Sequence, residues 1–507
     1  MGEVKTLEEL VAAVQGLRGQ GKTLVQCHGV FDLLHPGHIR HLQAAKRLGD
    51  ALVVTVTPDR FVNKGPNRPA FPEVLRAESL AALGCVDLVA VNRWPTAVEA
   101  IALIRPDVYA KGRDYSDPSE DETGAIREEE EAVRAVGGRM HLTEEPAFSS
   151  SHLLNTHFGV CPQEARPFLR GFREAHRVED IVARLKALSS MTALVVGDAI
   201  IDQYWYVEGL GKSPKDNIIT TRHLGEESFA GGALATANHL AGLCGTVHLV
   251  TCLGRDGHEA FIRSHLRPNV TPHILHHGGP TTVKRRLVDP AFLTKLIEVA
   301  WLDETAPAPV RQELRGHLEE TLRGDKAGDY ALVVAADFGH GLIDRQIAEL
   351  LSGFPQFLAV NAQANSANMG FNLITKYPGA DYVCLDEPEL RLACRDRHGR
   401  LEDLVSRMMD ELRCQRLAVT LGHRGSMAYS PEGGFTRIPA LSDRVVDRMG
   451  AGDAYLAVTA PCVAAGMPME EVSFVGNAAS ALAVGTVGNR EPVDPVALFR
   501  FIKALLA

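Results

Sequence analysis

Apolar and polar residues follow two different periods along the first third of the chain. Apolar positions spaced as on one helix face occupy residues 7–17 and 39–48, whereas short apolar runs of the β type occupy 23–27 and 51–56. A strand, a helix and a strand joined by short links form a right-handed parallel unit, so we expect an α/β domain. Further strands are predicted at residues 86–91 and 107–111, and the domain is predicted to span residues 1–160.

The pattern starts again beyond a charged stretch of helical spacing. Residues 161–190 are predicted to form a connecting helix, and an apolar run at 193–196 begins a second domain over residues 191–507. Its alternation of strands and helices again predicts a mostly parallel sheet that is covered on both faces. Its later strands are predicted at residues 330–335, 357–360, 382–385 and 417–420.

Composition narrows the kind of protein. The 507 residues, 45% hydrophobic and 23% charged, are too many for one ordinary core and are typical of a soluble globular protein. A formal net charge of -10 argues against a nucleic-acid partner, and no apolar run is long enough to span a membrane. The nine cysteines include no Cys-x-x-Cys pair, and the N-terminus lacks a signal-peptide pattern, so we expect a cytoplasmic enzyme with reduced thiols.

The first candidate site lies where the strand at 23–27 meets the helix at 39–48. The sequence there reads Gly29-Val30-Phe31-Asp32-Leu33-Leu34-His35-Pro36-Gly37-His38. Proline suits the first turn of a helix, and glycine lets another molecule approach the backbone closely. The unpaired N–H groups and partial positive charge of a helix start suit phosphate, so we predict a nucleotide-phosphate site faced by His35 and His38.

Cationic and hydroxyl side chains in a Gly/Pro loop, after that loop, at a later strand end and ahead of a last helix strengthen that hypothesis. A transferring phosphoryl group spreads negative charge over its equatorial oxygens, and cations with helix-end N–H groups stabilise that charge without a covalent intermediate. The candidates are Lys64, Arg68, Arg76, Lys111, Ser149 and Ser150.

Together these residues resemble the cytidylyltransferase-like nucleotidyltransferases over residues 23–157, with the heptose 1-phosphate adenylyltransferase branch nearest and glycerol-3-phosphate cytidylyltransferases second. The resemblance implies a Rossmann-like domain in which His35 and His38 stabilise the pentacovalent α-phosphate and Lys64 neutralises the phosphates of a nucleoside triphosphate. The nucleotide contacts that it implies are Gly29, Phe31, Asp32, Arg68, Arg76, Lys111, Ser149 and Ser150.

A second candidate site follows from a small-residue turn, Gly450-Ala451-Gly452-Asp453, ahead of an apolar helical run. Such a turn at a helix start forms an anion hole, and an acid at its end can accept a hydroxyl proton. A glycine turn after the strand at 417–420, the pair Gly231-Gly232 and the pair Lys284-Arg285 are candidates for contact with a polar, phosphorylated ligand.

These features resemble the ribokinase-like (PfkB) sugar kinases over residues 193–506, and residues 196–205 and 337–341 are similar to the heptose-kinase branch. The resemblance implies a ribokinase-like α/β sandwich with Asp453 as catalytic base and Glu387 acting indirectly on a metal ion. It places nucleotide at Thr420, Gly422, Gly425, Gly450, Ala451, Gly452 and Asn477, and substrate at Asp198, Asp202, Gly231, Gly232, Lys284, Arg285 and Asp337.

The chain departs from that family at several positions. Ala235 replaces a sugar-binding asparagine, and Cys384 stands where the asparagine of an Asn-x-x-Glu element is expected. The sequence Asn361-Ala362-Gln363 replaces a common Asp-Pro strand end. A lost asparagine–hydroxyl bond is worth about 1–3 kcal/mol, enough to change the preferred sugar without abolishing kinase chemistry.

We therefore expect a bifunctional enzyme that phosphorylates a sugar or sugar phosphate and then makes an activated nucleotide sugar of the ADP-heptose kind, releasing pyrophosphate. The domain order is the reverse of that in the fused heptose enzymes. Expected cofactors and partners are Mg2+, ATP or CTP, a sugar or polyol phosphate, and a second copy in a homodimer. The alternative is a CTP-dependent cytidylyltransferase for a polyol or sugar phosphate, whose second domain only binds ligand or dimerises.

Overall fold

The computed structural model describes residues 2–62, 68–112, 125–143, 161–302, 307–325 and 327–506. The chain forms two compact units, one of residues 1–160 with 499–507 and one of residues 161–498. Both units are α/β, which confirms the fold class expected from the sequence. Three of the expected site residues lie outside the described residues: Lys64, Ser149 and Ser150.

The first unit is built on a six-stranded, all-parallel sheet with the strand order β1-β4-β3-β2-β5-β6. The order reverses between β2 and β5, and ligands of open parallel sheets bind outside the carboxyl ends of the strands at such a reversal. The elements are β1 (Glu3–Val4), α1 (Leu7–Gly19), β2 (Leu24–Gly29), α2 (Pro36–Lys46), β3 (Ala51–Val56), α3 (Glu73–Ala81), β4 (Leu88–Val91), α4 (Val98–Ile104), β5 (Val108–Gly112), α5 (Ala125–Ala135) and β6 (Arg139–Thr143).

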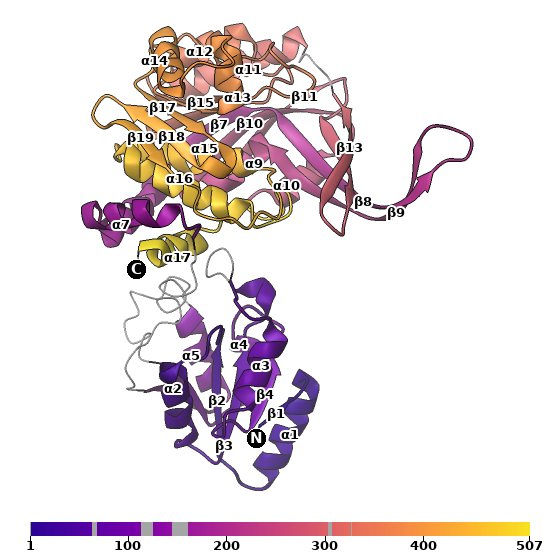
Figure 1. Ribbon diagram of the computed structural model, residues 1–507, viewed down its shortest axis with the longest axis vertical. Helices are drawn as coiled ribbons and strands as arrows, with labels where there is room; N and C mark the ends of the chain where they lie inside the picture. Colours follow the sequence, from indigo (N-terminus) through magenta and orange to yellow (C-terminus); the bar gives the residue numbers. More distant parts are fainter. Residues whose placement is uncertain are drawn as a thin grey trace. The chain divides into compact units, whose positions relative to one another are not determined.

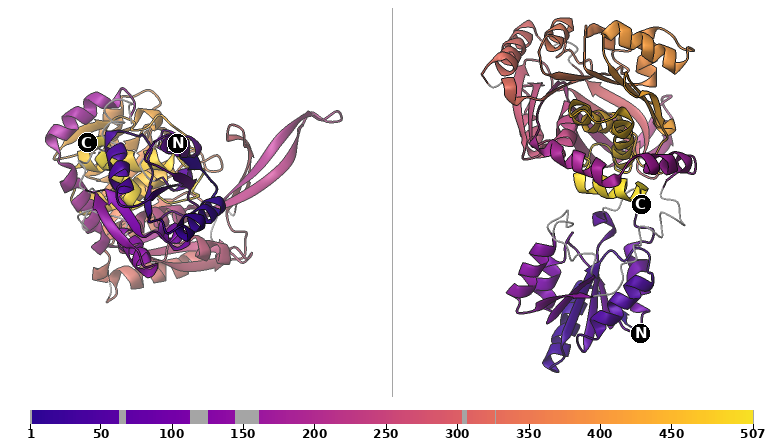
Figure 2. Two further views of the ribbon diagram at one scale, coloured as in Figure 1. Left: turned by 90° about the horizontal axis from the view of Figure 1, so that it is seen from below. Right: turned by 90° about the vertical axis from the view of Figure 1, so that its left-hand side faces the viewer.

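Helices cover both faces of this sheet, as Figures 1 and 2 show. Successive residues of a strand point to opposite faces, so a strand that is covered twice must be apolar throughout. Val54 of β3 packs with Leu42 of α2 and Leu80 of α3, whereas its neighbour Val53 packs in a cluster with Leu10 of α1. The run at 51–56, which is apolar except for Thr55, therefore predicted the strand correctly.

The second unit contains a nine-stranded sheet in the order β11-β10-β7-β14-β15-β16-β17-β18-β19. The sheet is parallel from β11 to β17 and antiparallel at β18 and β19. Its strands are β7 (Thr192–Gly197), β10 (Thr246–Gly254), β11 (Val270–His277), β14 (Leu332–Asp337), β15 (Phe357–Ala362), β16 (Tyr382–Asp386), β17 (Arg416–Thr420), β18 (Ser426–Ser430) and β19 (Gly434–Ile438).

Helices sandwich this sheet, with α11 to α14 on one face and α9, α15 and α16 on the other (Figure 1). Leu314 of α11, Leu351 of α12 and Met408 of α14 share one buried cluster with the strands. On the other side α15 contacts α9, α16 and the strands β14, β15 and β16. The helices are α7 (Ala165–Ala175), α8 (Val178–Ala187), α9 (Ala233–Leu240), α10 (Glu259–His265), α11 (Ala308–Arg323), α12 (Arg345–Ser352), α13 (Glu387–Cys394), α14 (Leu401–Leu412), α15 (Ala451–Ala464) and α16 (Met469–Ala483). The last helix, α17 (Pro495–Leu506), begins in this unit, and its part from residue 499 on is grouped with the first unit.

Residues 161–190 form two helices, α7 and α8, where the charged pattern predicted one connecting helix. The backbone is extended at His176 and Arg177, which end the first helix and cap the second. Phe172 of α7 packs on Phe474 of α16 with ring centroids 4.5 Å apart. The segment is therefore packed against the second unit.

A small sheet of four strands, in the order β13-β12-β8-β9, completes the second unit. The strands β8 (Ala199–Lys212) and β9 (Ile219–Gly232) form a long hairpin, and β12 (Val283–Asp289) pairs with β8 only as far as Tyr206 and with β13 (Thr294–Trp301) on its other side. The outer half of the hairpin extends away from the unit (Figure 2). Among the described residues no helix is long and apolar enough to cross a lipid bilayer, and the nine cysteines form no disulfide.

Candidate functional site

The turn between β2 and α2 brings the two histidines of the first unit together. His35 caps α2, because its Nδ1 accepts a hydrogen bond of 3.1 Å from the Gly37 N–H, and Pro36 takes the first helical position. The rings of His35 and His38 stack with centroids 3.9 Å apart, and the Phe31 ring packs edge-on against His38. This pair follows β2 at the reversal of strand order, where the sequence predicted an anion site.

Phe31 bends the chain sharply into this turn. Its φ of +49° is uncommon for a bulky residue and costs about 1–3 kcal/mol, a strain that tends to be retained at functional sites. A Cβ on Gly29 would lie 3.2 Å from the Phe31 ring, so the small residue at the end of β2 leaves room for the bend.

Arg68 and Asp32 form a buried ion pair beside the histidine turn. Arg68 donates through Nε to one oxygen of Asp32, and the Ala70 N–H donates to the other. The Arg68 Nη1 and Nη2 atoms are buried and have no hydrogen-bond partner among the residues that the structure describes. A buried donor without an acceptor costs free energy of folding, and the two parallel N–H donors of a guanidinium match the oxygens of phosphate or carboxylate. Arg68 therefore fits an anion at this site.

Arg76, which the sequence placed among the nucleotide contacts, is a structural residue instead. Its side chain is fully buried and donates to the backbone carbonyls of Phe71, Val30 and Thr57 as well as to the Asp59 carboxylate. These partners come from the segments that follow β2 and β3 and precede α3. The guanidinium thus holds loops of the first unit together, and these bonds leave it turned toward protein.

Lys111 at the end of β5 is neutralised by an acid that sequence reasoning missed. Its Nζ lies 2.8 Å from the carboxylate of Glu129 on α5, and both side chains are buried. Burial and the positive charge of Lys111 lower the pKa of the nearby His41 to about 4. A nucleotide contact at Lys111 stays a prediction.

The second unit holds its candidate acid at the start of α15. Gly450 is the N-cap, with a φ of +79°, and a Cβ there would lie 1.9 Å from the Asn489 side-chain oxygen, so only glycine fits. The first N–H groups of a helix have no helical acceptor, which gives the turn from Gly450 to Asp453 the backbone of an anion site. Asp453 is the third residue of α15, the helix that contacts β14, β15 and β16.

Asp453 is buried among charged groups that shift its pKa. Burial and the negative charge of Asp202 raise the pKa of Asp453 to about 7, against a hydrogen bond from Gln363 and the positive charge of Lys284. A carboxyl group that titrates near neutral pH can accept a proton efficiently there. The arrangement agrees with a base at this position, and its catalytic role stays a prediction.

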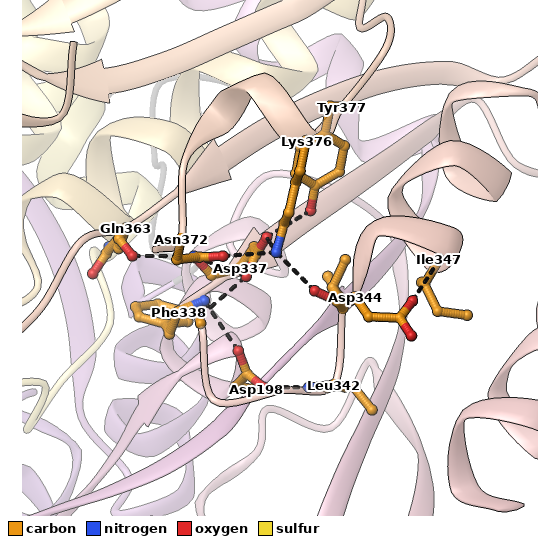
Figure 3. Close-up of polar contacts among 12 residues, drawn as sticks. Asp198, Asp337, Phe338, Leu342, Asp344, Ile347, Gln363, Asn372, Lys376 and Tyr377 are labelled. Carbon is orange, nitrogen blue, oxygen red and sulfur yellow. Dashed lines mark hydrogen bonds and ion pairs between the residues drawn. The ribbon is translucent and has the colours of Figure 1, made fainter. Parts of the chain in front are cut away.

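Asp198, at the end of β7, anchors a loop that follows β14. Its carboxylate accepts hydrogen bonds from the backbone N–H groups of Phe338, His340 and Leu342 at 3.1, 3.3 and 3.2 Å. Figure 3 shows Asp198 with Phe338 and Leu342. Burial and the negative charge of Asp337 raise the pKa of Asp198 to about 6. Asp198, which the sequence predicted as a substrate contact, therefore also holds the loop of residues 338–342 in place over the strand ends.

Asp337 sits at the centre of a buried polar network behind that loop (Figure 3). Its carboxylate pairs with Lys376 at 2.5 Å and accepts hydrogen bonds from the Tyr377 hydroxyl and the Asn372 amide. Lys376 also donates to the Asn372 side-chain oxygen at 2.7 Å. Because these bonds occupy the Asp337 carboxylate, the structure makes it a support for the loop and not the direct substrate contact expected from the sequence.

A cavity of about 20 Å³ lies beside the loop and has room for one water-sized group. The buried Nε2 of His340 has no hydrogen-bond partner among the described residues. Burial and the positive charge of Lys284 lower the pKa of His340 to about 4, so its ring is neutral at pH 7. The lining residues are Asp198, Ala199, Cys252, His277, Thr282, His340 and Leu342.

Neighbouring cations on β12 face opposite sides of the small sheet. The charge of Lys284 acts on Asp202, Asp198 and Asp453, so its side chain faces the candidate site. Arg285 lies on the other face, where its guanidinium stacks on Trp205 and Trp301 and bonds to Gln203. Arg285 is thus a packing residue, and its expected substrate contact is wrong.

Two glycines of β9 let this strand approach the site closely. A Cβ on Gly231 would lie 2.1 Å from the Asp202 carboxylate, and one on Gly232 would lie 2.5 Å from the Asp198 carbonyl. Asp202 itself pairs with Arg286 of β12 in a buried ion pair. The glycine pair therefore fits backbone packing around both acids.

Glu387, the expected indirect metal residue, does not fit that role because Arg391 and Arg424 both pair with its carboxylate. The buried acid is Glu389, two residues on, which accepts hydrogen bonds from the Ala364 and Asp386 N–H groups. Asp386-x-x-Glu389 has the same spacing as Cys384-x-x-Glu387, the pair expected at the Asn-x-x-Glu element. Among the residues that the structure describes, no three His, Cys, Asp or Glu side chains form a metal site.

The remaining expected nucleotide residues lie after β17. Thr420 ends that strand, and a 3-10 turn at Gly422–Arg424 leads to Gly425, whose N–H donates to the Gly422 carbonyl at 3.0 Å. Asn477 of α16 is buried and donates to the carbonyls of Ile438 and Pro439, so it braces the end of β19. Its amide donors are therefore committed to protein.

Comparisons with known proteins identify one family match in each of the two units. Residues 27–156 match the cytidylyltransferase-like family and residues 370–495 match the pfkB family of carbohydrate kinases. The "Bifunctional protein HldE" of Methylobacillus flagellatus is 42% identical over 155 residues, 30% of each chain, and its namesake from Edwardsiella ictaluri is 42% identical over 155 residues, 30% of this chain and 31% of that protein. The matched stretch lies in the N-terminal part of this chain.

The chain thus spans less than a third of the length of the curated relatives that it matches. The crystal structure of phosphofructokinase-2 from Escherichia coli in complex with substrates and products superimposes with a TM-score of 0.50 and 14% identity, covering 62% of this chain and 99% of that one. This likeness concerns the fold alone. The chain therefore joins a cytidylyltransferase-like domain in its N-terminal part to a pfkB family carbohydrate kinase domain in its C-terminal part.

Proposed function

We propose that the chain is a bifunctional enzyme of nucleotide-sugar synthesis. The kinase domain phosphorylates a sugar or sugar phosphate with ATP, and the N-terminal domain joins a sugar phosphate to a nucleotide with release of pyrophosphate. The product is a nucleotide sugar of the ADP-heptose kind. In each domain the proposal is supported by a helix start whose unpaired N–H groups suit an anion: the start of α2, with the His35–His38 stack, and the start of α15 at Gly450.

The observation that carries the kinase proposal is the buried Asp453, whose pKa is raised to about 7 at the start of α15. In the reaction a substrate hydroxyl gives its proton to Asp453, and its oxygen attacks the γ-phosphorus of ATP. The bond from that phosphorus to the β–γ bridging oxygen breaks, and ADP leaves. The N–H groups of the first turn of α15 stabilise the charge that develops on the phosphoryl oxygens.

In the transferase reaction a phosphate oxygen of the sugar phosphate attacks the α-phosphorus of a nucleoside triphosphate, and pyrophosphate leaves. His35 and His38, stacked at the start of α2, donate hydrogen bonds to the α-phosphate oxygens as five-coordinate phosphorus forms. The idle Nη1 and Nη2 atoms of Arg68 suit the departing phosphates. Lys64, Lys111, Ser149 and Ser150 remain proposed contributors to the same nucleotide site.

Mg2+ is proposed to enter the kinase site with the nucleotide, where it would neutralise phosphate charge. The pairing of Glu387 with two arginines excludes it as a direct ligand, so no step is assigned to a metal held by that residue.

The kinase half is tested by ADP release from the full chain with a panel of neutral sugars and sugar phosphates. Asp453→Asn should lower kcat by about 10²-fold or more, because general-base catalysis contributes about that factor. The exposed Asp443→Asn is the matched control and should keep wild-type turnover. The absence of ADP release with every sugar, or full activity of Asp453→Asn, would remove the kinase half.

The transferase half is tested by pyrophosphate release with ATP and with CTP across sugar and polyol phosphates. His35→Ala and His38→Ala should each reduce turnover, while the exposed His398→Ala should not. Preference for CTP would favour the cytidylyltransferase alternative over the ADP-heptose kind of product. Full activity of both histidine variants would refute the assignment of the site.

A homodimer is proposed as the working assembly, with the small sheet as its contact. The outer strand β13 exposes Ile297, Val299 and Trp301 at 58%, 44% and 41% of their surfaces. Light scattering of wild type and Val299→Lys distinguishes the outcomes, because a charge in such an interface should give a monomer.

A further inference from the structure

Gln363 makes a hydrogen bond to Asp453 that was not predicted from the sequence. It follows β15, where the sequence departs from the common Asp-Pro strand end, and its side-chain Nε2 donates to the Oδ1 of Asp453 at 2.9 Å. Among the residues that the structure describes, no other hydrogen bond to the Asp453 side chain is present. The second carboxylate oxygen, Oδ2, remains for a ligand.

The backbone of Gln363 is fixed on both sides. Its N–H donates to the Asp337 carbonyl at 2.8 Å, and its carbonyl accepts from the Asn372 amide at 3.1 Å. Asn372 is in turn held by the Asp337 carboxylate and by Lys376, as Figure 3 shows. The amide that meets Asp453 therefore projects from a rigid support, which is the same network that carries the loop of residues 338–342.

Charged and titratable groups face Asp453 from every side of this pocket. Asp202 of β8 and Lys284 of β12 act from the small sheet, and Glu389 of α13 and Cys384 of β16 act from the large sheet. Two of the four are carboxyl groups and one is a cation. The Gln363 amide is a donor that stabilises the carboxylate in this setting without adding a charge.

We propose that Gln363 is a positioning residue for Asp453: its amide donates to Oδ1 and turns Oδ2 toward the hydroxyl that is to be phosphorylated. This inference rests on the proposed kinase function. The backbone of the same residue bonds to Asp337 and Asn372 in the network below the 338–342 loop, so one segment, residues 363–372, positions both the base and the loop.

The direct test follows the carboxyl carbon of Asp453 by NMR in the full chain labelled with [13Cγ]aspartate. The signal is identified as the one missing from Asp453→Asn. In Gln363→Leu its titration midpoint should move to higher pH by about one unit, because the carboxylate loses a hydrogen-bond donor. Gln346→Leu, an amide on the exposed face of α12, is the matched control and should leave the midpoint unchanged. An unchanged midpoint in Gln363→Leu would overturn the inference.

Kinetics supply the second test. The acidic limb of the kcat profile should move in Gln363→Leu by the same amount as the NMR midpoint, while KM for ATP stays within about twofold. Gln363→Glu should move the limb further in the same direction, since it places a second carboxyl group against Asp453. A uniform loss of kcat at all pH values would reduce Gln363 to a structural residue and contradict the proposal. The NMR result is independent of turnover, so a chain without kinase activity would refute the proposed function while the midpoint still decides the role of Gln363.

Discussion

Replacing Arg76 with methionine should destabilise the first unit without touching the nucleotide. Methionine keeps much of the apolar stem but removes every donor of the guanidinium. The Thr57 carbonyl, which is buried, and the carbonyls of Val30 and Phe71, which are part-buried, each lose their partner. The carboxylate of Asp59 also loses its charge partner, but it is 39% exposed and can rehydrate.

These losses give an expected magnitude. A buried polar group left without a partner costs about 1–3 kcal/mol, and exposed ion pairs contribute little. One buried and two part-buried carbonyls therefore lower the free energy of unfolding by about 3–5 kcal/mol. For a unit of this size that corresponds to a fall in Tm of roughly 10 °C.

Equilibrium unfolding in urea measures the effect. Trp94 is the tryptophan of residues 1–160, so Trp205→Phe and Trp301→Phe make its fluorescence specific for the first unit. Arg60→Met, which removes a hydrogen bond from an exposed arginine to the Arg93 carbonyl, should change stability by less than about 0.5 kcal/mol. Unchanged unfolding of Arg76→Met with a raised KM for the nucleoside triphosphate would refute the structural role and restore the nucleotide contact.

Three further predictions concern the second unit. Lys376→Met leaves the buried Asp337 carboxylate without its cation and should lower the free energy of unfolding by about 3–5 kcal/mol. Asp337→Asn in the same chain should restore part of that loss. A decrease of less than about 1 kcal/mol in Lys376→Met would contradict the ion pair. Burial and the charge of Asp386 raise the pKa of Glu389, so its contribution favours the folded state at low pH and is lost as the pH rises through the folded pKa. Glu389→Gln should therefore raise Tm more at pH 8.5 than at pH 6, and equal shifts at both would argue against a raised pKa. Because the lowered pKa of His340 keeps its ring neutral, the ratio of kcat/KM between wild type and His340→Ala should be the same at pH 6 and pH 9, whereas an effect confined to low pH would indicate a charged ring.

Features that depend on local chemistry could be predicted from the sequence. The start of α2 was recognisable because proline and glycine each have a distinct place in a first helical turn, with a histidine on either side. The strand at 51–56 is observed over the same residues, since a doubly covered parallel strand must be apolar throughout. The turn from Gly450 to Asp453 was predictable for a related reason, namely that only small residues fit it.

Features that depend on distant partners could not be predicted. Lys284 and Arg285 are adjacent cations, and only the pairing of β12 with β8 and β13 decides which one faces the site. Glu387 and Glu389 differ by their place at the start of α13, where Asp386 is the N-cap and Glu389 completes a capping box. Arg76 lies on α3, and only the convergence of three separate segments on its side chain distinguishes it from a solvent-facing arginine. The hairpin of β8 and β9 was missed because its outer half carries mixed polar and apolar residues without a covered face.

That hairpin has a mechanical consequence. β8 starts next to Asp198 and carries Asp202 within the site, yet it continues without a break to Lys212 at the far end. Its ladder with β9 is irregular between Tyr206 and Val207 and again between Gly209 and Gly211, just beyond the last residue that β12 holds. We therefore expect the hairpin to bend at these two irregularities, because β12 holds the inner half of β8 and the outer half is held by β9 alone. A force applied at the tip is absorbed there, and the inner half can keep Asp202 at a constant distance from Asp453 while the tip moves.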